Sequence, residues 1–181
     1  YIIDEHLEKI KKSVKLEYDL YTKVYILLLM HYGMRSYDIV SLKHDCLLMS
    51  DKDGKFDLHY VDHKQKEKVV IPAITQYIAK SISSLMLLTN NLRTESGLPY
   101  VFLKKRRDGK VYVLKAYQKS MLESFVKKHN IVDSGGNFIK ITSHMFRRTL
   151  ATNMQSEGVS IDATQSILNH KHNRTTFKHY I

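Results

Sequence analysis

One arginine stands at a place in the sequence where its charge needs a partner. At about 100° per residue, the spacing of apolar residues predicts a helix over residues 143–157. Its apolar face is formed by Phe146, Leu150 and Met154. Arg147 lies at the edge of that face, so its guanidinium should be partly buried and should need a carboxylate or an anionic ligand. Arg147 is therefore a candidate anion-binding residue, whereas His144 and Arg148 point away from the apolar face.

The whole chain is also strongly basic. Its 181 residues include 29 Lys and Arg against 18 Asp and Glu, which leaves a net charge of +11. Such an excess attracts polyanions, and nucleic acid is the commonest of them. A basic run is formed by Lys104, Lys105, Arg106 and Arg107. The run is either a set of phosphate contacts or a solvated turn, and a merely lysine-rich surface is the alternative to a nucleic-acid partner.

The composition excludes several classes of protein. A hydrophobic fraction of 43% with 26% charged residues is typical of a globular domain and not of a disordered or fibrous chain. The longest apolar run, residues 24–30, is too short to span a bilayer, so we expect a soluble, intracellular protein. Cys46 is the single cysteine, which excludes an internal disulfide and a cysteine-rich zinc site. Only 7 Gly and 2 Pro favour long helices.

Apolar periodicity predicts a mainly α single domain without repeats. The predicted helices cover residues 4–12, 14–32, 73–88, 114–128, 143–157, 160–168 and 175–180. Gly33 ends the second of these helices and Ser36 begins a further short one, so the segment that holds Arg35 is short and fixed. Ser143 is the predicted N-cap of the helix that ends near residue 157, and Ser160 begins the next helix.

A small antiparallel β-hairpin interrupts the helices. Its first strand is predicted from the alternation of Phe56, Leu58 and Tyr60 with polar residues. Its second strand covers residues 66–71 and ends at Pro72, and residues 62–65 form the turn. Lys64 then lies at the tip of the hairpin. Residues 90–109 are expected to form a loop with a short strand over 100–103.

Five short motifs follow one another along residues 33–180. They are Gly-Met-Arg with Arg35, the hairpin lysine Lys64, His-x-x-Arg from His144 to Arg147, Leu-Asn-His ending at His170, and Thr-Thr-x-Lys-His-Tyr ending at Tyr180. In this order they resemble the catalytic domain of the tyrosine recombinases, also called the phage integrase family. Each motif alone is weak, but the ordered set is specific. The resemblance implies the mainly α fold of these DNA breaking and rejoining enzymes.

The resemblance assigns a role in phosphoryl transfer to each motif. Arg35 and Arg147 would clamp the non-bridging oxygens of a DNA phosphate, on which negative charge grows during attack. Tyr180 would be the nucleophile, and His144 would take the proton of its phenol. These groups together would form a covalent 3′-phosphotyrosyl intermediate.

Other residues would protonate the leaving group, bind the phosphate or support the catalytic side chains. Lys64 would give a proton to the leaving 5′-oxygen, although Lys66 is close enough in sequence to compete. His170 would donate a hydrogen bond to the scissile phosphate. Asp38 would support the arginines or His144 by contacting these side chains and not the DNA.

The implied function is site-specific DNA recombination of the integrase or transposase type, serving a mobile element. A 5′-hydroxyl of another strand would reverse the covalent step, with no metal, ATP or other cofactor. The partners would be double-stranded DNA and, in the full-length protein, further copies in a tetramer, with no membrane. We therefore expect a cytoplasmic, nucleoid-associated protein of bacterial type. Candidate contacts with DNA phosphates are Lys66, Lys104, Lys105, Arg106, Arg107 and Arg148.

The sequence departs from the family pattern at two positions. Asn169 stands where the family usually has Gly, and Arg148 stands where a second His is common. Asn tolerates the left-handed backbone, and neither change removes a catalytic group. Family members usually carry an N-terminal core-binding domain, so we expect residues 1–181 to be a single catalytic domain from a longer protein.

Alternatives to a recombinase remain open at this point. A type IB topoisomerase uses a similar residue set to relax supercoils, and a DNA-binding module could keep the fold without catalysis. Taken singly, Arg35 could cap a helix, and Lys64 and His170 could be ordinary surface residues. A zinc site built on His170, His172 and His179 is disfavoured because they lie within one short segment and the lone cysteine adds little.

Overall fold

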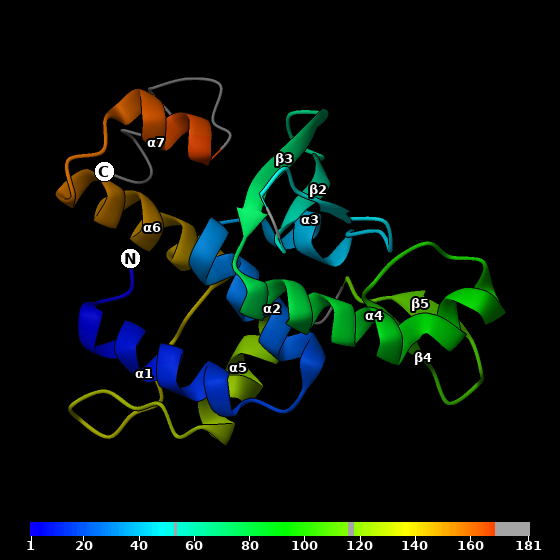
Figure 1. Ribbon diagram of the computed structural model, residues 1–181. Helices are drawn as coiled ribbons and strands as arrows, with labels where there is room; N and C mark the ends of the chain where they lie inside the picture. The colour runs from blue at the N-terminus through cyan, green and yellow to red at the C-terminus, as the bar shows by residue number, and fades with distance from the viewer. Residues whose placement is uncertain (53, 116–117, 169–181) are drawn as a thin grey trace. The chain divides into compact units, whose positions relative to one another are not determined.

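The computed structural model describes residues 1–52, 54–115 and 118–168 (Figure 1). In this part the protein is mainly helical with small antiparallel sheets, as predicted. The helices are α1 (Asp4–Leu16), α2 (Leu20–Tyr32), α3 (Ser36–Val40), α4 (Gln76–Ser96), α5 (Gln118–Lys128), α6 (Ser143–Ser156) and α7 (Ile161–Ile167). The strands are β1 (Leu47–Met49), β2 (Phe56–Asp62), β3 (Glu67–Ile74), β4 (Leu103–Lys105) and β5 (Val111–Val113). The helix predicted over residues 175–180 lies outside the described residues.

The chain divides into two compact units. Unit 1 comprises Tyr1–Tyr18, Ile26–Arg35 and Gln118–Ile181, and unit 2 comprises Asp19–Tyr25 and Ser36–Tyr117. Helix α2 contributes residues to both units. The prediction that residues 1–181 form a single catalytic domain stays a prediction.

The boundary between α1 and α2 departs from the sequence prediction. One helix was expected over residues 14–32, and this is wrong, because α1 ends at Leu16 and α2 begins at Leu20. Glu17 is only 2% exposed and leaves the helical conformation, and its carboxylate accepts hydrogen bonds from Lys128 Nζ (2.5 Å) and His129 Nε2 (2.6 Å). A buried carboxylate requires such partners, so these tertiary contacts outweigh the helical periodicity.

The sheet β1-β2-β3 of unit 2 contains the predicted hairpin. Strands β2 and β3 pair antiparallel up to Asp62 and Glu67, which leaves residues 63–66 as the loop. Strand β3 does not end at Pro72 as expected but continues to Ile74. This is possible because β3 is an edge strand, where a proline need not donate to a neighbour. A register shift between Phe56 and Leu58 accompanies the extension.

Helix α4 is longer than predicted. The sequence favoured a helix over 73–88 and a loop over 90–109, but α4 runs from Gln76 to Ser96, so the loop prediction is wrong for residues 90–96. Gly97 ends the helix with a left-handed φ of 72°. The short strand expected over 100–103 is displaced, because β4 covers Leu103–Lys105 and shares only Leu103 with the prediction. Strand β4 pairs with β5, and Tyr100 forms an isolated bridge with Lys43.

The helices at the end of the described chain agree closely with prediction. Helix α6 begins at Ser143, and its N-cap is Thr142, not the predicted Ser143; the Thr142 side chain accepts a hydrogen bond from Met145 N. Helix α7 covers Ile161–Ile167 of the predicted 160–168, and Ser160 is its N-cap, accepting a hydrogen bond from Ala163 N. Helix α5 begins at Gln118, a few residues later than the predicted start at residue 114.

Candidate active site

Arg147 lies at the centre of the motifs that belong to unit 1. It is 5% exposed, so the prediction of a partly buried guanidinium is confirmed and even exceeded. Its Nη1 donates to the carbonyl oxygen of Gly33, and its Nη2 donates to the carbonyl oxygen of Leu168. These partners are backbone carbonyls, a class that the sequence prediction, a carboxylate or an anion, did not include. One side chain on α6 thereby binds the residue after α2 and the residue after α7.

Gly33 makes this close meeting of three segments possible. Its φ is 57°, and an added Cβ would lie 2.9 Å from Leu168 Cδ2 and 3.0 Å from Leu150 Cδ2. Leu168 and Ala151 are buried together, with Leu150 packed against them. Figure 1 shows α6 and α7 side by side in this part of the chain. A residue without a side chain is therefore needed at position 33 both for conformation and for space.

Other predicted residues of unit 1 lie close in sequence to Gly33 and Arg147. Arg35 is half-buried and follows Gly33 by two residues, so Arg147 holds the segment that carries the second arginine. His144 is exposed in the first turn of α6, and its spacing of three places it on the same side of the helix as Arg147. Arg148 is exposed. His170 and Tyr180 lie outside the described residues.

The hairpin lysines belong to unit 2. Lys64 and Lys66 are both exposed in the loop between β2 and β3. Asp62 Oδ1 accepts a hydrogen bond from Gln65 N (2.9 Å), and Lys66 has a φ of 56°, which together make a tight turn. Lys64 is thus at the tip, as predicted, with its ammonium in solvent.

Asp38 binds the base of this loop. It is 2% exposed on α3, and its Oδ1 accepts hydrogen bonds from His63 N (3.1 Å) and from His63 Nδ1 (2.8 Å). The prediction that Asp38 supports the arginines or His144 stays a prediction. Sequence patterns did not indicate His63, since its separation of 25 residues from Asp38 carries no local signal. Its position directly before Lys64 was the available hint.

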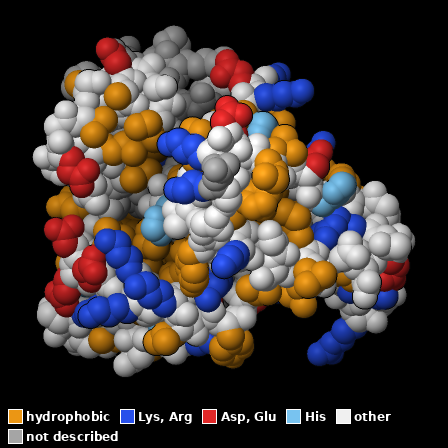
Figure 2. All heavy atoms as spheres, viewed as in Figure 1, with side chains coloured by type: hydrophobic (Ala, Val, Ile, Leu, Met, Phe, Trp, Pro, Cys, Tyr) orange, Lys and Arg blue, Asp and Glu red, His pale blue; other side chains and the backbone are white. Residues whose placement is uncertain are grey.

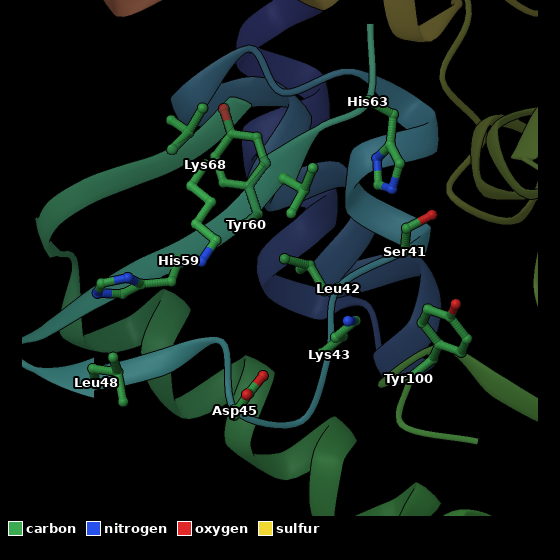
Figure 3. A pocket seen from close by; sticks show the side chains of 12 residues that line it. Ser41, Leu42, Lys43, Asp45, Leu48, His59, Tyr60, His63, Lys68 and Tyr100 are labelled. Carbon is green, nitrogen blue, oxygen red and sulfur yellow. The ribbon is translucent and has the colours of Figure 1, made fainter. Parts of the chain in front are cut away.

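A pocket of about 490 Å³ lies against the sheet of unit 2 (Figure 3). Its basic lining side chains are Lys43, His59, His63 and Lys68, and Asp45 is acidic. The remaining lining is formed by Ser41, Leu42, Leu48, Tyr60, Val61, Val69 and Tyr100. Sequence patterns did not indicate this pocket, because its residues come from separate segments of unit 2. Its basic character suits an anionic group such as a phosphate.

The basic run is part of the β4–β5 hairpin. Lys105 pairs with Glu95 (2.7 Å), Lys104 Nζ lies 4.7 Å from the Tyr21 ring centre, and Arg106 lies 5.2 Å from that of Tyr112. Figure 2 shows lysine and arginine side chains at several separate places on the face that it displays, with acidic side chains near some of them. Whether the run binds phosphate stays open.

Two other side chains with nucleophilic atoms lack the features of a nucleophile. Burial, followed by the charge of Asp19, raises the pKa of Tyr21 to about 12, and its hydroxyl donates to the Leu103 carbonyl (2.5 Å). Burial likewise raises the pKa of the Cys46 thiol to about 12. Both groups are therefore protonated at neutral pH.

Two kinds of feature are absent from the described ranges. No group of three or more His, Cys, Asp or Glu side chains in these ranges could hold a metal ion. No described helix combines the length and the apolar character needed to cross a bilayer.

The fold defines a class of protein. The crystal structure of XerA recombinase superposes with a TM-score of 0.72 at 19% identity, over 99% of this chain and 59% of that one. The XerH site-specific recombinase, in a pre-cleavage complex with its difH substrate, gives a TM-score of 0.72 at 18% identity, over 98% and 48%. The catalytic domain of bacteriophage HP1 integrase gives 0.58 at 15% identity, over 99% and 85%. This is the fold of tyrosine recombinase catalytic domains.

The sequence comparisons identify the family. The profile of the phage integrase family matches residues 2–181, and the chain belongs to this family. Transposase B from transposon Tn554 of Staphylococcus aureus strain N315 is 27% identical over 169 residues, covering 93% of this chain and 24% of that protein. Tyrosine recombinase XerA of Pyrococcus horikoshii is 27% identical over 173 residues, covering 93% and 53%. The chain thus spans about a quarter to a half of these relatives' length.

Proposed function

We propose that this chain is the catalytic part of a site-specific DNA recombinase of the integrase or transposase type. The observation that carries the proposal is Arg147, whose guanidinium holds the segments that lead to Arg35 and to His170. Family membership and fold support the same function. A relative named a transposase points to a mobile element as the DNA that is moved.

The arginines act on the phosphate. A phosphodiester gains negative charge on its non-bridging oxygens when a nucleophile attacks, and guanidinium groups bind such oxygens in pairs. Arg35 and Arg147 perform this role. Arg147 is already desolvated by burial, which strengthens its attraction to an anion.

The covalent step exchanges one ester for another. The phenol oxygen of Tyr180 attacks phosphorus, its proton passes to His144, and the bond from phosphorus to the 5′-oxygen breaks. The departing oxygen takes a proton from Lys64 or Lys66 and becomes a 5′-hydroxyl. His170 hydrogen-bonds the phosphate, and the product is a 3′-phosphotyrosyl link.

The stored ester makes strand exchange possible. A 5′-hydroxyl from another strand attacks the phosphotyrosine and releases Tyr180, so no ATP and no metal are consumed. The substrate is double-stranded DNA, and copies of the full-length protein assemble into a tetramer around two duplexes. Lys66, Arg148 and the run from Lys104 to Arg107 contact phosphates outside the scissile position.

A suicide substrate tests the proposal. The chain is incubated, with EDTA present, with a library of nicked duplexes in which the fragment beyond the scissile phosphate diffuses away after cleavage. We expect a covalent protein–DNA adduct whose peptide maps to Tyr180. Tyr180→Phe should abolish the adduct, while the matched control Tyr1→Phe should leave it unchanged, because Tyr1 is an exposed terminal residue.

The other outcomes separate the alternatives. DNA binding without an adduct at any site would favour a non-catalytic DNA-binding module. An adduct at Tyr180 followed by relaxation of supercoils, but without exchange between two duplexes, would favour a type IB topoisomerase. Adduct formation that requires a metal ion would contradict the proposed chemistry.

A further inference from the structure

The loop that carries Lys64 is tied to α3 through the residue directly before it. His63 uses both its backbone N–H and its ring Nδ1 to donate to one oxygen, Asp38 Oδ1, at 3.1 and 2.8 Å. Asp38 is 2% exposed, so its carboxylate is fixed by its surroundings. Two hydrogen bonds to one fixed acceptor restrain the peptide and the side chain of His63 together.

The ring of His63 is restrained on another side by an aromatic contact. The Tyr37 ring meets it edge to face, with centroids 4.7 Å apart and planes at 87°. Lys115 Nζ lies 5.0 Å from the centre of the Tyr37 ring and donates weakly to its hydroxyl at 3.4 Å. The ring of His63 also borders the pocket of Figure 3. These contacts restrain the imidazole, while the His63 side chain stays 41% exposed to solvent.

The β2–β3 hairpin is held by bonds other than those between Asp38 and His63. Strands β2 and β3 are held by their own ladder up to the pair Asp62 and Glu67, and the turn is closed by Gln65 N on Asp62. The bonds between Asp38 and His63 therefore act on the loop beyond the ladder. What they determine is where the main chain of Lys64 lies relative to α3.

We propose that His63 is a positioning residue for the proton transfer to the leaving group, because its pairing with Asp38 holds the loop from which Lys64 donates. This inference rests on the proposed function. A lysine has a long flexible side chain, so the place of its main chain decides which atoms its ammonium reaches. A misplacement of about 1 Å costs about 100-fold in rate.

The experiment compares two leaving groups. Once the cleaved site is known from the library, the same suicide duplex is made with oxygen or with sulfur as the bridging 5′ atom. A thiol has a pKa of about 8.5, so the sulfur leaving group departs as a thiolate without a proton from the protein. The oxygen leaving group is an alkoxide, which needs a proton. The rate of adduct formation is measured at saturating DNA for the unchanged chain, His63→Ala, His63→Asn, His63→Gln and Lys64→Ala.

Each variant has an expected result. His63→Ala should slow cleavage of the oxygen substrate by about 10- to 100-fold, the range for losing hydrogen bonds to a charged group, and should cleave the sulfur substrate at nearly the unchanged rate. His63→Asn places an amide N–H where Nδ1 was and should stay within about threefold. His63→Gln, whose amide reaches the other ring nitrogen's position, should resemble the alanine variant. Lys64→Ala should show the same rescue by sulfur.

A matched control is His59→Ala. His59 lines the same pocket from β2 but does not bind Asp38, so its loss removes a ring from the pocket without releasing the loop. We expect both substrates to be cleaved at unchanged rates at saturating DNA. Thermal unfolding of all variants separates a folding defect from a positioning defect, and His63→Asn keeps the inference testable where the alanine variant fails to fold.

The outcomes distinguish the inference from the function on which it rests. Equal losses on oxygen and sulfur substrates, or an oxygen rate unchanged by His63→Ala, would overturn the positioning role while leaving the recombinase chemistry intact. A loss seen below saturating DNA but not at saturation would show that His63 acts on DNA binding and would overturn the positioning role as well. No adduct from the full-length protein at any site of the library would refute the proposed function and, with it, this role.

Discussion

The two groups of catalytic candidates are built in opposite ways. In unit 1, Arg147 is enclosed, and folding alone fixes its guanidinium on the carbonyls of Gly33 and Leu168. In unit 2, Lys64 is exposed at a loop tip, and the tie to the rest of the unit passes through its neighbour His63. In the proposed mechanism, charge stabilisation would thus depend on the core, whereas proton donation would depend on a surface loop.

This difference follows from what each group must do. A group that stabilises a transition state electrostatically works best when its dipoles are fixed before the reaction, because reorganisation then costs nothing. A proton donor has to approach the leaving oxygen and withdraw from it, which a flexible lysine on a short loop allows. Mutations of the candidates in unit 1 should therefore lower both the cleavage rate and the free energy of unfolding. Mutations of the lysines in unit 2 should lower the cleavage rate alone.

The largest expected effect comes from Arg147→Ala. It removes a phosphate ligand and leaves two buried carbonyls without a donor, so adduct formation should fall by at least about 1,000-fold. The free energy of unfolding should fall by about 3 kcal/mol in the same variant. Both are measured on one preparation, by the suicide-substrate assay and by denaturant titration.

The neighbouring arginine is the matched control for that variant. Arg148 is exposed on the same helix, so Arg148→Ala should leave the unfolding free energy unchanged within about 0.5 kcal/mol. Its effect should be limited to weaker DNA binding at low salt. A stability loss as large in Arg148→Ala as in Arg147→Ala would contradict the enclosed arrangement described for unit 1.

The next largest effect concerns the hairpin lysines. Removing the general acid should slow cleavage by about 100- to 10,000-fold, and we expect this for Lys64→Ala. Lys66→Ala changes a nearby exposed residue of the same loop and should lose much less. Thermal unfolding should be unchanged in both, because neither side chain is buried. The reverse order of rates would assign proton donation to Lys66.

The sequence predicted the elements wherever the local pattern and the tertiary contacts agree. The hairpin of β2 and β3 follows from strand alternation, which acts over a few residues, and α7 was expected over nearly the residues that it covers. The break after Leu16 could not be predicted, because it depends on the contacts of Glu17 with Lys128 and His129. These two residues lie 111 and 112 positions further along the chain. Only the folded chain brings these residues together.

The same distinction applies to the candidate site. The burial of Arg147 followed from its place on a helical face, since that is a local property. Its carbonyl partners did not follow, because backbone atoms carry no sequence signal. The pairing of His63 with Asp38 was missed for the same reason as Glu17, as it joins residues 25 positions apart.

The smallest expected effect compares two glycines that follow helices in unit 1. Gly33 and Gly158 both have a left-handed φ, at 57° and 81°, so an alanine at either position is strained by about 1 kcal/mol. At Gly158 nothing lies within 4 Å of an added Cβ, and the cost should end there. At Gly33 the Cβ would also collide with Leu168 and Leu150, which adds about 1–3 kcal/mol.

Denaturant titration of Gly33→Ala and Gly158→Ala measures the difference directly. We expect Gly33→Ala to be the less stable by about 1–3 kcal/mol, since the strain common to both variants cancels in the comparison. Adduct formation should fall in Gly33→Ala alone, because the added methyl displaces the carbonyl that Arg147 holds. Equal stability of the two variants would mean that α2, α6 and α7 do not meet closely at Gly33. The enclosed arrangement described for Arg147 in unit 1 would then be wrong.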